Sequence, residues 1–109
     1  MKRFILIYHY NEEAKVAMAS FTKEEQQASM IAWHAWRDGL GEKLVDFGGI
    51  LFGGTNIYAD KEEPCTKNIL GYSFIQADDL EEAKTLIADH PHLKWHAGAQ
   101  IELHEYMSM

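Results

Sequence analysis

The stretch of sequence that decides the fold begins with seven residues, Ile69-Leu70-Gly71-Tyr72-Ser73-Phe74-Ile75. This run is apolar and rich in strand formers, so it predicts a buried strand. Beyond Asp78 and Asp79, either of which can cap a helix, apolar side chains recur at helical spacing over residues 80–88. Pro91 ends that helix, and residues 99–106 alternate between apolar and polar side chains. Residues 69–106 therefore predict a strand, a helix and a final strand in succession.

The first half of the chain supplies the elements that pack with this stretch. Residues 4–8 are continuously apolar and predict a strand that is buried on both faces. Residues 11–18 predict one or two helical turns. Thr22 and Glu25 have the spacing of a capping box, which predicts a long helix from there to about residue 44. Its buried stripe follows three- and four-residue steps through Ser29, Trp33, Trp36, Leu40 and Leu44.

Glycine pairs punctuate the middle of the chain. They occupy positions 48–49 and 53–54 and bracket a short apolar run, so we expect two short strands around a tight turn. Residues 60–68 are charged and contain Pro64, which predicts an exposed loop.

The order of elements indicates one α+β domain over residues 1–109. Strand, helix, two strands, helix and strand is typical of a ferredoxin-like βαββαβ sandwich with an antiparallel sheet. Two helices cover only one face of such a sheet, whereas the first strand is apolar on both faces. The simplest way to bury the other face is a second subunit that packs its sheet on this one, so the sequence predicts a homodimer.

Composition narrows the classes of partner. The formal net charge of −7 argues against nucleic acid and against an anionic membrane surface, because both are bound through lysine and arginine. No apolar run has transmembrane length. Cys65 is the only cysteine, which fits a reducing, cytoplasmic setting and leaves no cysteine pair for a zinc site.

Several short motifs resemble the YCII-related family, which includes proteins with an Asp-Gly-Pro-Phe motif. They are the strand at residues 4–8, the segment 33–54 with its glycine-rich exit, the segment 70–83 and the tail from His90 to residue 103. The resemblance implies a ferredoxin-like subunit that forms a dimeric α+β barrel. For some members it implies small-molecule catalysis by a helix histidine and by an aspartate before the proline that follows the second helix. Here the matching positions are near Arg37, with His34 one turn earlier, and at His90.

One family motif is missing from the chain. Where the family has Asp-Gly-Pro-Phe, the corresponding loop holds Glu63-Pro64-Cys65-Thr66.

Seven residues are candidates for a small-molecule site. His34 or His90 could move a proton near neutral pH, and Arg37 could hold a carboxylate. The aromatic wall would come from Trp33, Trp36 and Trp95, with His9 at the end of the first strand. The alternative for the tryptophans is core packing, and the alternative for the polar residues is a solvated surface.

A second cluster, His90, His92 and His96, has the pattern His-x-His-x-x-x-His. Neutral imidazoles bind zinc, copper or nickel, so the cluster is a candidate metal site. The alternative is a polar loop in which the rings cap backbone groups, and we expect no bound cofactor.

Three functions stay open from the sequence. The first is a cofactor-independent enzyme that acts on a small cyclic or carboxylate-bearing molecule by histidine acid-base chemistry. The second is a ligand-binding or accessory barrel without chemistry of its own. The third is a metal-binding module built on the histidine cluster.

Overall fold

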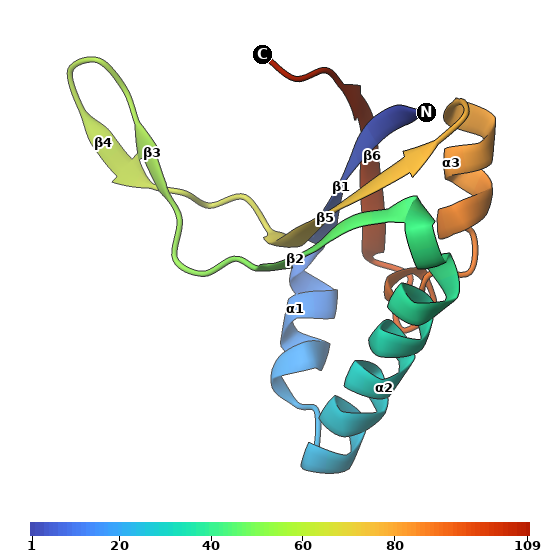
Figure 1. Cartoon of the computed structure of the whole chain (residues 1–109). Coiled ribbons are helices and arrows are strands. Elements are labelled where there is room, and N and C mark those ends of the chain that lie inside the picture. The colour runs from blue at the N-terminus through green and yellow to red at the C-terminus, as the bar shows by residue number, and fades with distance from the viewer.

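The computed structural model describes all residues 1–109 and has an α+β architecture. The main sheet consists of β1 (Lys2–Tyr10), β2 (Leu44–Ile50), β5 (Ile69–Ala77) and β6 (Ala99–Tyr106). Its strand order is β2-β5-β1-β6 and every neighbouring pair is antiparallel. The helices are α1 (Glu12–Ala19), α2 (Lys23–Leu40) and α3 (Leu80–Ile87), which lie on one side of the sheet (Figure 1). This architecture is compatible with a ferredoxin-like fold.

The caps and periodicities in the sequence place most elements correctly. Thr22 accepts from the Glu25 amide while Glu25 reaches back to the Thr22 amide, so the predicted capping box is present. Asp79 caps α3 by accepting from the Glu82 amide at 2.8 Å. The predicted strands at residues 4–8, 69–75 and 99–106 lie within β1, β5 and β6.

The prediction was wrong for the segment between α2 and β5. The helix ends at Leu40, a short 3-10 turn η1 (Gly41–Lys43) follows, and Leu44 begins β2 instead of ending the helix. The glycine pair at 48–49 lies inside β2, not in a turn. Gly48 has φ +81°, and a Cβ there would lie 1.8 Å from the Tyr72 carbonyl oxygen, so only glycine lets this irregular strand approach β5.

The predicted second short strand forms a separate hairpin. β3 (Thr55–Ile57) pairs with β4 (Glu62–Pro64) in a two-stranded sheet, where the sequence predicted a loop for the β4 residues. The hairpin projects away from the main sheet (Figure 1).

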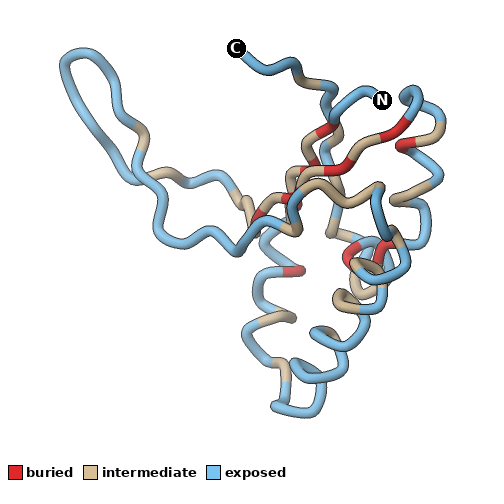
Figure 2. The backbone as a smooth tube through the Cα atoms, in the orientation of Figure 1, coloured by how far each residue is buried: buried red, intermediate tan, exposed pale blue.

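The core is small and lies on the helix-covered face of the sheet. Phe4, Leu6 and Tyr8 alternate with half-exposed residues along β1 and are at most 2% exposed. Ile75 and Ala77 of β5 and Ala83 of α3 complete this core, and Figure 2 shows the buried positions along the two central strands. The prediction that β1 is buried on both faces was wrong for the single chain, because no helix covers Ile5 and Ile7.

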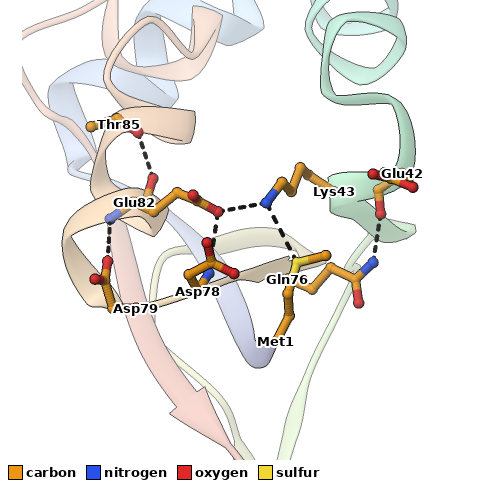
Figure 3. Close-up of polar contacts among 8 residues, drawn as sticks. All are labelled: Met1, Glu42, Lys43, Gln76, Asp78, Asp79, Glu82 and Thr85. Carbon is orange, nitrogen blue, oxygen red and sulfur yellow. Dashed lines mark hydrogen bonds and ion pairs between the residues drawn. The ribbon is translucent and has the colours of Figure 1, made fainter.

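Polar contacts connect α3 and β5 to η1, the turn that follows α2 (Figure 3). Lys43 Nζ lies 2.7 Å from Glu82 Oε1, and both side chains are about one third exposed or less. Gln76 donates to the Glu42 carbonyl at 2.6 Å, which ties β5 to η1. The pairing with Lys43 holds the pKa of the Glu82 carboxyl below its usual value, so the pair is ionised at neutral pH.

Trp36 links α2 to α3. Its indole Nε1 donates to the Leu86 carbonyl at 3.0 Å, and its ring packs on His90 with centroids 4.2 Å apart. Trp36→Ala should lower the free energy of unfolding by about 3 kcal/mol, because a large packed ring is lost. Trp36→Phe keeps a ring and loses the donor, so it should cost about 1 kcal/mol in urea titrations. Equal stability of all three proteins would contradict this assignment.

The helices are all unsuited to crossing a membrane, since none combines the necessary length with sufficient apolar character.

Candidate functional site

A cavity of about 400 Å³ lies between α1, α2 and the β2–β5–β1 side of the sheet. Eight of the 17 residues that line it are aromatic or methionine: Tyr8, Met18, Phe21, Met30, Trp33, Phe47, Tyr72 and Trp95. The polar side chains on the wall are Gln26, Ser29, His34 and His92. No Asp, Glu, Lys or Arg side chain lines the cavity. The space therefore suits an apolar ring and offers few polar partners.

Tyr8 stands at the inner wall with its hydroxyl in a buried chain of hydrogen bonds. The Ser73 hydroxyl must donate to the Phe47 carbonyl, at 2.6 Å, because a carbonyl only accepts. Ser73 Oγ then accepts from the Tyr8 hydroxyl at 2.7 Å. The Tyr8 oxygen in turn accepts from His90 Nε2 at 3.1 Å. Each hydrogen in the chain is thereby placed.

His90 is held as one neutral tautomer by this chain. Its Nδ1 accepts the His92 backbone amide at 2.9 Å, so the ring proton sits on Nε2. His90 is fully buried, and this burial, with His92 nearby, lowers its pKa to about 3. Burial also raises the pKa of the Tyr8 hydroxyl. Both groups are uncharged at neutral pH, which suits an interior without counter-ions.

His92 is also buried and lies on the cavity wall itself. Its Nε2 donates to the His9 carbonyl at 2.8 Å, and its Nδ1 accepts from Trp95 Nε1 at 3.3 Å. Burial lowers the pKa of His92. The ring therefore serves to position the Trp95 indole against the cavity.

The histidine cluster does not converge on a common point. No group of three His, Cys, Asp or Glu side chains in the chain is arranged to hold a metal ion. Each ring uses Nδ1 as an acceptor: His90 for the His92 amide, His92 for Trp95, and His96 for the Gly98 amide at 2.8 Å. The lone pairs that a metal would need are already engaged.

Three of the seven sequence candidates line the cavity: His34, Trp33 and Trp95. His90 is one hydrogen bond away, through Tyr8. Trp36 packs behind the wall, on His90 and Phe47. These placements follow α2, which turns Trp33 and His34 toward the cavity and Trp36 toward α3.

Arg37 and His9 lie outside the cavity. The Arg37 side chain is 36% exposed, donates to Asp38 at 2.9 Å and lies over the Phe47 ring at 5.5 Å. His9 follows Tyr8 on the strand and so points to the opposite face, where it contacts Glu102 at 2.8 Å. It borders a separate polar pocket of about 330 Å³ with Asn11 and Asn68.

Sequence reasoning missed Tyr8 and His92 as wall residues. Tyr8 had a signal, since it continues the period of Phe4 and Leu6 on the buried face. For His92 the sequence predicts either a metal ligand or a loop ring that caps a backbone group, and neither prediction places it on the cavity wall. Comparison of the sequence with protein-family models and with curated proteins gives no match for this chain.

The buried neutral histidine predicts a pH dependence of stability. The unfolded chain binds a proton at His90 near pH 6.5, while the folded chain does so only near pH 3. Stability is therefore full above pH 6.5 and falls as the pH drops toward 3, by about 1.4 kcal/mol per pH unit for this group. His92 acts in the same direction.

This dependence can be measured by urea unfolding between pH 7 and pH 5. His90→Asn keeps an acceptor for the His92 amide but cannot titrate, so its stability should fall less steeply with acid than that of the wild type. Parallel pH profiles for the two proteins would show that His90 is not the group responsible.

Proposed function

We propose that this chain binds a small, uncharged molecule with an apolar ring in the cavity between α2 and the sheet. The observation that carries this proposal is a wall of aromatic and methionine side chains without a charged residue. A volume of about 400 Å³ falls within the roughly 300–1,000 Å³ typical of small-molecule sites. A charged ligand group would lose its hydration there without gaining a counter-ion.

The polar side chains of the wall suggest how such a ligand is oriented. Gln26, Ser29 and His34 all lie on α2, on the helical side of the cavity. These groups can exchange hydrogen bonds with one or two hydroxyl or carbonyl oxygens. Arg37 is engaged with Asp38 and Phe47, so the geometry favours a neutral ligand over the carboxylate expected from the sequence.

Filling the cavity should abolish binding. Ser29→Phe places a ring inside it, whereas Ala35→Phe places the same ring on the exposed face of α2. Titration of tryptophan fluorescence with a panel of neutral, anionic and cationic aromatic fragments should show saturable quenching by neutral members only. Ser29→Phe should lose that quenching and Ala35→Phe should keep it. Preference for the anionic fragments would overturn the proposal.

A second candidate function is acid-base catalysis without a cofactor. His34 is a wall imidazole with no hydrogen-bond partner inside the protein, and it packs against Phe47 with ring centroids 6.1 Å apart. Its nitrogens are thus free to exchange a proton with a bound molecule. His90 and His92 are unsuited to this role because their nitrogens are engaged.

Proton exchange offers a test that needs no known substrate. Cyclic ketones incubated with the protein in deuterated water should exchange the proton beside the carbonyl, as NMR would detect. His34→Gln should slow this exchange about 10²–10⁴-fold and leave fragment binding intact. Exchange that is unchanged in His34→Gln, or absent in the wild type, would leave binding as the function.

We also propose that the chain belongs to the YCII-related family, that it acts in the cytoplasm and that it pairs sheet to sheet as a dimeric α+β barrel. The strand order β2-β5-β1-β6 supports the ferredoxin-like part. The uncovered sheet face supports the pairing: Tyr72, Phe74 and Tyr106 form an edge-to-face row beside Ile5 and Ile7.

Sedimentation equilibrium at micromolar concentration should give twice the chain mass of 12.5 kDa. Phe74→Asp places a charge in the aromatic row of the uncovered face and should yield monomers, since a buried unpaired charge is costly. A wild-type chain that stays monomeric at high concentration would refute the barrel.

A further inference from the structure

The hairpin that projects from the sheet has no partner within the chain. We call residues 51–65, which include β3 and β4, the arm. Figure 1 shows it extending away from the helices and the main sheet, and Figure 2 shows it almost entirely exposed. No residue of the arm is buried.

The arm and its root are nevertheless apolar. Five of the 13 exposed large hydrophobic residues of the chain lie within nine positions: Ile50, Leu51, Phe52, Ile57 and Tyr58. Phe52 is 87% exposed and Ile57 is 78% exposed. Such a concentration of exposed apolar side chains marks an interaction surface.

The arm is also organised from within. Tyr58 donates to Glu63 at 2.9 Å, and Lys61 lies over the Tyr58 ring at 4.8 Å. The Cys65 amide donates to the Gly54 carbonyl at 2.9 Å and closes the base. A two-stranded hairpin is only marginally stable in water unless its side chains pack on another surface. The arm therefore requires a partner surface.

The dimensions of the molecule show that the whole chain exposes more surface than a compact monomer does. The chain exposes 7565 Å², against about 6,200 Å² for a folded monomer of this mass. Its radius of gyration is 15.2 Å, against about 13 Å for a compact chain of this length. The excess of about 1,400 Å² exceeds the roughly 800 Å² that each partner buries in a standard interface.

We propose that the arm packs on a second copy of this chain and is an essential part of the dimer contact. This inference rests on the pairing proposed above and assigns it a specific element. Contact is made by apolar side chains and not by strand addition at β4, because Glu62 and Glu63 are charged and Pro64 lacks an amide donor. Phe52 and Ile57 are the anchoring residues.

The test compares two isoleucines of similar exposure. Ile57→Ser alters the arm, and Ile31→Ser alters the outer face of α2, where Ile31 is 70% exposed. Sedimentation should show that Ile57→Ser raises the dissociation constant of the dimer. The expected rise is about tenfold for each arm, and so about 100-fold for the two arms of a dimer. Ile31→Ser should associate like the wild type. Because both side chains are exposed, circular dichroism should show unchanged folding.

Photo-crosslinking gives an independent readout. Benzoylphenylalanine in place of Phe52 should produce a covalent dimer on irradiation, and in place of Ile31 it should not. A wild-type monomer would overturn both the pairing and the arm contact. A stable dimer that Ile57→Ser does not weaken, or that does not crosslink from position 52, would overturn the arm contact alone.

Discussion

The structure depends on the hydrogen bonds made by one buried hydroxyl group, that of Tyr8. It sits in β1, one of the two central strands of the sheet, on the face that the helices cover, and Tyr8 is only 2% exposed. Ser73 and His90 satisfy it, and each is satisfied in turn by a backbone group from Phe47 or His92. Removing one member would leave its neighbours without a hydrogen-bond partner. A buried polar group without a partner costs about 1–3 kcal/mol of stability. The network thereby holds β1, β2, β5 and the turn after α3 in one arrangement.

This network also divides the helical layer into a packed end and an open end. Toward α3, small residues such as Ala77 and Ala83 let the helix approach the sheet, and the Lys43–Glu82 pair fastens it. Toward α1, large rings around Tyr8 hold the helices and the sheet apart, and the space between them is the cavity. Because the polar atoms near Tyr8 are engaged with one another, the cavity presents ring faces and edges to its contents. Its selectivity among ligands would then come mainly from the free energy that polar ligand groups lose when they leave water.

Local signals in the sequence were sufficient for most of the fold but for only part of the site. The two helix caps and the alternation of residues 99–106 act over a few residues, so they could be recognised directly. β2 was missed because Gly48-Gly49 has the composition of a turn, and only the Tyr72 carbonyl opposite shows why a strand needs glycine there. Trp33 and His34 could be predicted from their positions on the long helix, and Trp95 from its aromatic character. The role of Tyr8 could not be found, since its partners lie 65 and 82 residues away.

The small core connects the proposed binding and the proposed pairing. Only 11 of 109 residues are buried in the single chain, so apolar burial within it offsets less chain entropy than is usual for a domain of this length. Association of the open sheet face and of the arm would add apolar burial and so stabilise the folded chains further. Strand β5 takes part in both: Ser73 joins the Tyr8 network on the helix-covered face, while the Tyr72 ring belongs to the aromatic row on the open face. Pairing at the open face would therefore also stabilise the strand that borders the cavity.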